Sequence, residues 1–410
     1  PALPHPVEAV IFGLAIVGAA FLLSWAAEAA QVDISAALAI AVLALIAVLP
    51  EYAVDFVFAF KGGKSVQAFG ESCPALGGGA ESPCSLALAN MTGANRLLIG
   101  VGWSMVAFIA WYRYRRGVRP RPSDERNTTA SGIILDRQHS IELGYLAVAT
   151  LYSLTLPLRE SITLVDAAIL VSIFAAYTWR VARAPAEDPH LVGPARYVGG
   201  RTKATRRAMV AAMFLYAAAM ILLTAELFAE ALVATGIELG ISEFFLVQWL
   251  APLASETPEL LVASLFAWRL ATNAGLGTLV SSKVNQWTLL VGTLPVVFTI
   301  AVGELHGLPI DSRQRQEIFL TAAQSFFAVA ILSNLSMSVR EAWMLFGLFW
   351  AQFILGAFIP EEFHGTELVI VSVIYLLLGM IVLVRDRARL PRLLRDGFLR
   401  SHEELRRSPV

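Results

Sequence analysis

The sequence has 410 residues, of which 57% are hydrophobic and only 15% are charged, and its mean hydropathy is +0.65. Ordinary soluble domains carry about 25% charged residues, so this composition excludes a typical soluble protein and indicates a polytopic membrane protein. The formal net charge of -1 favours no particular partner, and the sequence contains no GxxxxGK[ST] phosphate loop, which argues against an ATP-driven pump.

Apolar runs of about 20 residues, the length that crosses a bilayer, predict eleven transmembrane helices. The first run has no basic residue before it and is long enough to span, so it is interpreted as a membrane helix and not as a cleavable signal peptide. The expected ranges are 7–31, 34–60, 85–112, 141–157, 163–182, 208–235, 241–268, 275–302, 316–334, 339–358 and 366–384.

Basic residues concentrate in three connecting segments, at 113–137, 180–207 and 385–407. With eleven spans all three segments fall on one side of the membrane, which the positive-inside rule makes the cytoplasmic side. The N-terminus then lies outside, as does the acidic loop that holds Glu361 and Glu362. We therefore expect an integral protein of the plasma (inner) membrane with its C-terminus in the cytoplasm.

Two cysteines, Cys73 and Cys84, lie in a Gly/Pro-rich connection between the second and third expected helices. The expected topology places this connection outside, where a pair that closes a short loop suits a disulfide. Two free thiols in a flexible loop are the alternative.

The C-terminal tail, 385–410, is rich in arginine. Basic residues directly after a membrane helix predict an amphipathic helix that contacts the bilayer through anionic lipid. In this context we expect no nucleic-acid partner.

A weak internal repeat joins the two halves of the chain. The second expected helix contains "VLPEY", with Glu51 directly after Pro50, and the seventh contains "ASETPELL", with Glu259 directly after Pro258. Each is followed by an apolar helix that begins with small and amide residues, "LALANMTGANRLL" and "LGTLVSSKVNQW". The second helix begins inside and the seventh begins outside, so the halves have opposite orientations. Inverted repeats of this kind are common in secondary transporters, whose sites lie where membrane helices are interrupted.

A proline within a membrane helix removes one backbone donor and frees a carbonyl about one turn earlier. Beside Glu51 and Glu259, such carbonyls and nearby hydroxyls form an oxygen-rich environment that suits hard cations such as Na⁺ and Ca²⁺. Carboxylates inside a membrane are costly and are usually functional, so we predict that both glutamates bind cations. The alternative is a carboxylate near a helix end that reaches interfacial water.

These motifs resemble those of the cation/calcium exchanger superfamily, which includes sodium/calcium and calcium/proton exchangers. Its two repeats carry a pattern close to G-T-S-x-P-E, followed by a helix with G-N-x-x-G-S-N-x-x-N. The resemblance implies that Glu51 and Glu259 coordinate the transported cations and that alternating access carries them across.

The resemblance implies further ligands at matching positions. Ser255 and Glu256 occupy the places of the Thr and Ser before the second Pro-Glu, so Glu256 adds a carboxylate; a protonated carboxyl with a structural role is the alternative. The other matches carry amide or hydroxyl groups, which hydrogen bonding between helices would also explain. They are Asn90, Asn95, Ser282 and Gln286.

The chain also departs from the family pattern. Ala47 and Val48 replace the hydroxyl pair of the first repeat, and Asp55, one turn after Glu51, is expected to compensate as a ligand. Lys283 replaces the Asn of G-S-N, where it is expected to neutralise a carboxylate or to substitute for a bound cation if it faces the cavity. A solvated or helix-end position is the alternative for Asp55 and for Lys283.

The expected fold is all-α, with two inverted-topology repeats of five helices and an additional C-terminal helix. The two repeats are expected at 1–183 and 208–360, with motifs around 47–103 and 251–292. The remaining segments are a basic cytoplasmic loop at 184–207, the extra helix at 361–384 and the basic tail at 385–410.

The predicted function is secondary-active antiport of Ca²⁺ or a similar cation against Na⁺ or H⁺, without enzymatic activity and without a cofactor. Antiport of Na⁺ or another monovalent cation against H⁺ is the nearest alternative, favoured by the missing hydroxyls and by Lys283. An intramembrane enzyme or a channel is the alternative from another class. The sequence leaves the ions, their stoichiometry and the oligomeric state open.

Overall fold

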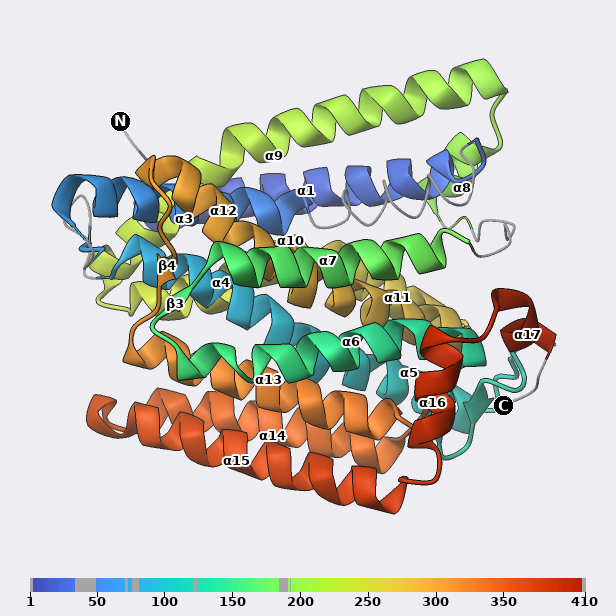
Figure 1. The fold of residues 1–410 in the computed structure, drawn as a ribbon. Coiled ribbons are helices and arrows are strands. Elements are labelled where there is room, and N and C mark those ends of the chain that lie inside the picture. Colours follow the sequence, from blue (N-terminus) through green and yellow to red (C-terminus); the bar gives the residue numbers. More distant parts are fainter. Residues whose placement is uncertain are drawn as a thin grey trace. The chain divides into compact units, whose positions relative to one another are not determined.

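The structure, a computed structural model, describes residues 3–33, 49–70, 73–75, 81–120, 124–183, 191 and 193–407 (Figure 1). The beginning of the second expected helix, including Ala47 and Val48, lies outside these residues. The chain divides into two compact units, and each unit collects three separate stretches of sequence. Unit 1 contains Pro1–Ala94, Ile162–Pro258 and Leu289–Pro309, and unit 2 contains Asn95–Ser161, Glu259–Thr288 and Ile310–Val410.

Unit 1 is built around two long helices, α1 and α9, which lie side by side (Figure 1). Its core there consists largely of alanine with a few larger aliphatic side chains, including Ala19, Leu23, Ala217 and Ile221. Small residues let membrane helices approach closely, so these helices pack along much of their length. Among the described residues, the helices that lie wholly in this unit are α1 (His5–Ala30), α3 (Leu49–Phe69), α7 (Leu164–Val181), α8 (Pro194–Gly199), α9 (Lys203–Leu239) and α12 (Val291–Val302).

Helix α3 packs against α9 and α12, and α12 also packs against α7. The contact between α3 and α12 depends on Gly63, because a Cβ there would lie 2.6 Å from the carbonyl oxygen of Phe298. Helix α3 carries the first Pro-Glu pair, so this packing fixes the helix that presents Glu51.

Unit 2 contains a further set of packed helices, in which α15 contacts both α13 and α14. Helix α13 packs against α15 and α6, and α14 packs against α5. The bounds are α5 (Ser104–Arg115), α6 (Ser140–Ser153), α11 (Thr272–Asn285), α13 (Ser312–Leu332), α14 (Val339–Phe358), α15 (Glu361–Arg385), α16 (Leu390–Phe398) and α17 (His402–Arg407), with single turns of 3-10 helix at Arg137–His139 and Leu156–Leu158.

Two helices, α4 (Pro83–Leu97) and α10 (Glu243–Trp268), contribute residues to both units. Helix α4 continues directly into a π-helical segment, Leu98–Trp103, and α11 continues into a second one, Gln286–Leu290. The first segment follows the amide-containing motif of the first half, and the second begins at Gln286, the last matched residue of the motif in the second half. Besides the Pro-Glu pairs, these π-helical segments are a second feature that occurs in both halves.

Short strands occur in the connections, where the sequence did not predict them. In unit 2, β1 (Thr128–Thr129), β2 (Gly132–Ile134) and β5 (Ser336–Ser338) form an antiparallel sheet in the order β1-β2-β5, with Ile133 opposite Met337. Two more short strands are β3 (Ser161–Ile162) and β4 (Leu308–Pro309).

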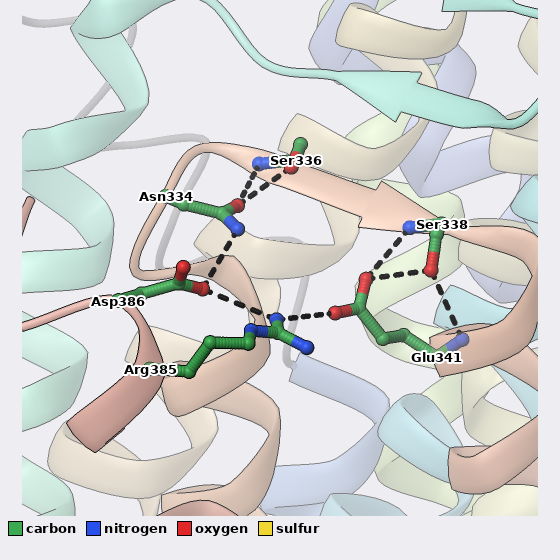
Figure 2. Close-up of polar contacts among 6 residues, drawn as sticks. All are labelled: Asn334, Ser336, Ser338, Glu341, Arg385 and Asp386. Atoms are coloured by element: carbon green, nitrogen blue, oxygen red, sulfur yellow. Dashed lines mark hydrogen bonds and ion pairs between the residues drawn. The ribbon is translucent and has the colours of Figure 1, made fainter. Parts of the chain in front are cut away.

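Polar contacts fasten the end of α15 to the start of α14 (Figure 2). Ser338 and Glu341 form a capping box at the start of α14, and Arg385 donates from Nη2 to Glu341 Oε1 at 2.9 Å. Asp386 accepts from Asn334 Nδ2 at 3.0 Å. The capping box satisfies backbone donors at a helix start, and the arginine ties that start to the next helix.

Each of the eleven expected ranges overlaps a described helix. Seven helical segments among the described residues are long and apolar enough to cross a membrane, which supports a polytopic helical protein; the count of eleven crossings stays a prediction. Glu361 and Glu362, expected in a loop, instead begin α15.

The C-terminal tail forms two short helices, α16 and α17. Helix α16 packs on α6, and Arg137 donates to the buried carboxylate of Asp396 at 2.6 Å. A Cβ at Gly397 would lie 2.5 Å from the carbonyl oxygen of Ser140, so the two helices approach closely. The first part of the tail therefore packs on protein; its expected contact with anionic lipid stays a prediction.

Cys73 and Cys84 are joined by a disulfide in unit 1. Both cysteines are buried, and Cys84 lies against Gly62 of α3. The bond therefore fastens the start of α4 to the connection that follows α3.

Candidate functional site

Helix α10 is interrupted by two prolines, Pro252 and Pro258. Neither has a backbone N–H, so the carbonyls of Gln248 and Ala254, four residues earlier, lose their usual helical donors. Freed carbonyls inside a membrane need other partners. The expected break in the hydrogen bonding of this helix is therefore present, and two prolines cause it where the sequence motif contained one.

The carbonyl of Gln248 is approached by α4 at Gly93. A Cβ at Gly93 would lie only 1.7 Å from this oxygen, so only glycine allows the approach. Gln248 Nε2 also donates to Thr92 Oγ1 at 3.4 Å. The glycine of the first amide motif thus covers a carbonyl that a proline has freed.

Glu51 of α3 and Glu256 of α10 form a pair of buried carboxylates in unit 1. Both residues are fully buried, and each offers a carboxylate oxygen within 4.8 Å of the other's. Two such charges repel one another strongly in a medium of low dielectric constant. The pair is therefore suited to hold a cation or protons.

Asp55 extends this group of oxygens along α3. It lies four residues after Glu51, on the same helix face. Asp55 Oδ1 accepts a hydrogen bond from Asn90 Nδ2 of α4 at 2.7 Å. The other oxygens of this pair, Asp55 Oδ2 and Asn90 Oδ1, are buried and accept no hydrogen bond from the described residues. Both could therefore act as ligands of a hard cation.

Glu259 follows Glu256 by three residues on α10, so the two lie on neighbouring positions of one helix face. Ser282 of α11 donates from Oγ to Glu259 Oε2 at 3.0 Å. The structure thus brings together these matched residues of the seventh and eighth expected helices. Ser255 is buried, and its hydroxyl bonds the carbonyls of Ala251 and Pro252 within its own helix.

Lys283 is fully buried in unit 2 and contacts Asn95. Its Nζ donates to Asn95 Oδ1 at 2.6 Å and to the backbone oxygen of Asn95 at 3.3 Å, and it lies 4.5 Å from the ring centre of Trp287. The aromatic face stabilises a cation by its quadrupole. The Asn95 amide oxygen, expected to face a transported ion, thus accepts from an ammonium. Trp287, which the sequence motifs do not single out, completes this contact.

Gln286 is also fully buried, and it begins the second π-helical segment. π-helical turns are rare and occur frequently at functional sites. Residues 286–290 therefore mark an irregular backbone next to the second motif.

The sodium/calcium exchanger protein family model matches residues 7–182 and 209–358. The chain belongs to this family. The match covers more than half of the exchanger and includes both Pro-Glu pairs. The family and the membrane-antiporter assignment that the sequence predicted are confirmed.

Solved structures show the same fold. The crystal structure of the H⁺/Ca²⁺ exchanger CAX matches this chain with 41% sequence identity and a TM-score of 0.84. The match covers 97% of this chain and 91% of the CAX chain. The Ca²⁺/H⁺ antiporter YfkE is similar at 14% identity, with a TM-score of 0.58 and coverages of 92% and 93%. The sodium-calcium exchanger NCX_Mj is similar at 15% identity, with a TM-score of 0.52 and coverages of 87% and 99%. The last two similarities show the fold alone. A search of curated proteins found no match for the exchanger.

Proposed function

We propose that this antiporter exchanges Ca²⁺ for H⁺ and that Glu51, Glu256 and Glu259 are the principal ligands of Ca²⁺. Asp55, Asn90, Ser255, Ser282 and Gln286 supply or position further oxygens. Transport is driven by an ion gradient, without enzymatic chemistry or a cofactor.

The observation that carries this proposal is the pair of buried carboxylates, Glu51 and Glu256, whose oxygens lie within 4.8 Å of one another. Calcium binds six to eight oxygen ligands and favours carboxylates and carbonyls. A single Ca²⁺ neutralises both negative charges, and two protons do so equally well. One pair of side chains therefore accepts either ion but not both, and this competition couples the two fluxes.

The choice of H⁺ over Na⁺ rests on two further observations. CAX, an H⁺/Ca²⁺ exchanger, is 41% identical to this chain over nearly all of its length. In addition, the ammonium of Lys283 bonds the amide oxygen of Asn95. We propose that Asn95 holds the lysine and that the site therefore offers one oxygen fewer to a second metal cation.

Orientation follows from the charge pattern. We propose that the C-terminus lies in the cytoplasm and the N-terminus outside, in a plasma (inner) membrane; the Arg-rich segments support this orientation. The Cys73–Cys84 disulfide supports this orientation, because disulfides persist on the oxidising side.

Transport into proteoliposomes tests the proposal. An outward proton gradient should drive ⁴⁵Ca²⁺ uptake, and an outward Na⁺ gradient should not. Na⁺-driven uptake would replace H⁺ by Na⁺ as the counter-ion. Na⁺-coupled proton movement without Ca²⁺ uptake would favour the monovalent alternative, and current without counter-transport would indicate a channel.

The ligand assignment is tested by Glu51→Gln and Glu256→Gln, each of which removes one charge and keeps the side-chain shape. Both variants should lose Ca²⁺ binding measured by calorimetry and Ca²⁺ uptake. Glu238→Gln, at an exposed glutamate near the end of α9, is the matched control and should behave as wild type. Normal Ca²⁺ binding in both variants would contradict the assignment.

A further inference from the structure

A second buried ionic cluster lies in unit 2, outside the residues proposed to bind Ca²⁺. Arg96 at the end of α4 donates from Nη1 to Glu317 of α13 and from Nη2 to Gln352 of α14. Gln324 of α13 donates to the backbone oxygen of Arg96 at 3.4 Å. Glu367 of α15 completes the cluster, within electrostatic reach of Arg96 and Glu317. Ionisable groups at such depth are costly and usually functional.

The cluster is closed to solvent. The side chains of Arg96 and Glu317 are 2% and 8% exposed, and Glu367 is 7% exposed. The Oε1 atom of Glu367 is buried and has no hydrogen-bond partner among the described residues. A buried carboxylate oxygen without a donor is unfavourable when charged, because nothing replaces the water it has lost.

The charges of the cluster do not balance. Arg96 supplies one positive charge, and Glu317 and Glu367 together supply two carboxylates. The groups that face Glu367 are Glu317 from α13, Arg96 from α4, the neutral Gln352 from α14, which hydrogen-bonds its carboxyl group, and His364 on its own helix. Two buried carboxylates beside one arginine favour the binding of a single proton. The guanidinium disfavours a metal cation at the same place.

A half-buried histidine, His364, neighbours Glu367. Glu367 lies in the second turn of α15, three residues after His364, so the two side chains share a helix face. The starts of α13 and α15 and the end of α14 lie at the same end of unit 2, opposite α16 (Figure 1). The basic residues at the end of α5 and in the tail lie at the α16 end. The cluster is thus close to the face proposed to be outside.

We propose that Glu367, together with Glu317 and Arg96, forms a proton-binding site of the exchange cycle that is separate from the calcium carboxylates. His364 passes the proton between outside water and Glu367. Arg96 directly follows Asn95 in α4, and Asn95 accepts a hydrogen bond from Lys283 of the second-repeat motif. The backbone of α4 therefore connects the proposed proton site to that motif. This inference rests on the proposed exchange of Ca²⁺ for H⁺.

The test is the number of protons moved per calcium ion, measured in proteoliposomes with a pH-sensitive dye and ⁴⁵Ca²⁺. Glu367→Gln should lower this ratio by one proton and make Ca²⁺ uptake less steeply dependent on outside pH, with unchanged Ca²⁺ affinity. Glu317→Gln should lower it by the same amount, because Arg96 then neutralises Glu367 and no spare carboxylate remains. Each variant thus tests the site if the other does not fold.

Glu367→Asp keeps a titratable carboxyl and should retain the wild-type ratio. Glu362→Gln, at an exposed glutamate of the same helix, should also leave the ratio unchanged. A wild-type ratio in Glu367→Gln or Glu317→Gln would overturn the inference and leave the cluster with a fixed structural proton. Wild-type protein that takes up Ca²⁺ without moving protons would instead contradict the proposed function itself.

Discussion

The ammonium of Lys283 lies 2.6 Å from the amide oxygen of Asn95, a residue 188 positions earlier in the chain. Both residues are fully buried, and each stands in the amide motif of a different half. The ammonium of Lys283 thus occupies the motif position at which the family pattern has the amide of an asparagine.

We expect a strong coupling free energy between these two residues. Asn95→Leu removes the amide oxygen that accepts from a buried ammonium at 2.6 Å, and Lys283→Met removes the ammonium that donates to that oxygen. A hydrogen bond to a charged group contributes about 1.5–3 kcal/mol, so the double variant should be more stable than the sum of the two single losses predicts by about that amount. Unfolding in mixed detergent micelles measures all three variants. Strict additivity would show that the contact contributes nothing to stability.

Gly93→Ala should destabilise the protein. The new Cβ would lie 1.7 Å from the carbonyl oxygen of Gln248, so α4 and α10 would have to move apart. Overpacking usually costs about 1–3 kcal/mol, and a clash with rigid backbone falls at the upper end. Gly18→Ala is the control, because a Cβ at Gly18 of α1 meets no atom within 4 Å. The thermal midpoint in detergent should fall only for the first variant, and equal midpoints would contradict the close approach.

Asp33 should make stability depend on pH in the acid range. It follows α1 and accepts two hydrogen bonds from Arg206, both at 2.7 Å, and these hold the pKa of Asp33 below its ordinary value. Because the folded pKa is the lower one, the contact stabilises the protein above the unfolded pKa and loses its effect as pH falls toward the folded pKa. Asp33→Asn removes this contribution.

The measurement compares the thermal midpoints of wild type and Asp33→Asn from neutral pH down to about pH 3, just below the ordinary aspartate pKa. The difference should be largest at neutral pH and should shrink in acid. The comparison cancels the titrations that both proteins share. A difference that stays constant with pH would show that Asp33 does not titrate with folding.

Replacing both cysteines by serine, Cys73→Ser with Cys84→Ser, should lower stability. The bond closes a loop with a sequence separation of 11, for which the chain-entropy model gives about 2–3 kcal/mol. Reduction of the wild type should produce the same decrease in thermal midpoint, whereas the double variant should not respond to reductant. Two free thiols in non-reducing mass mapping would contradict the disulfide.

Most of the helical framework could be predicted from the sequence, because a span is set by local composition. The expected ranges 163–182 and 339–358 differ from α7 and α14 by at most one residue at either end. The Pro-Glu pairs also marked the helices that hold Glu51 and Glu256, since a proline and a carboxylate within an apolar run are both costly.

The pairing of distant side chains could not be predicted. Helical periodicity shows which face a residue occupies but not which helix it meets, so the contact of Lys283 with Asn95 needed coordinates. Arg96 did leave a signal, because it is a charge well inside the expected span 85–112, whereas Glu317 and Glu367 stand at the polar starts of the expected spans 316–334 and 366–384. Treating a charge inside a span as a site candidate would have found Arg96, but not its two carboxylate neighbours.

The two π-helical segments have a consequence for how each motif is aimed. A π turn holds one residue more than an α turn, and one residue rotates a helix by about 100°. Residues before Leu98 and before Gln286 therefore point in directions that a regular helix would not give them relative to the residues that follow. Deleting one residue from either segment would straighten the helix and turn its amide motif away from its present partners. The direction in which the side chains of each amide motif point is thus set by one extra residue in the adjoining π-helical segment.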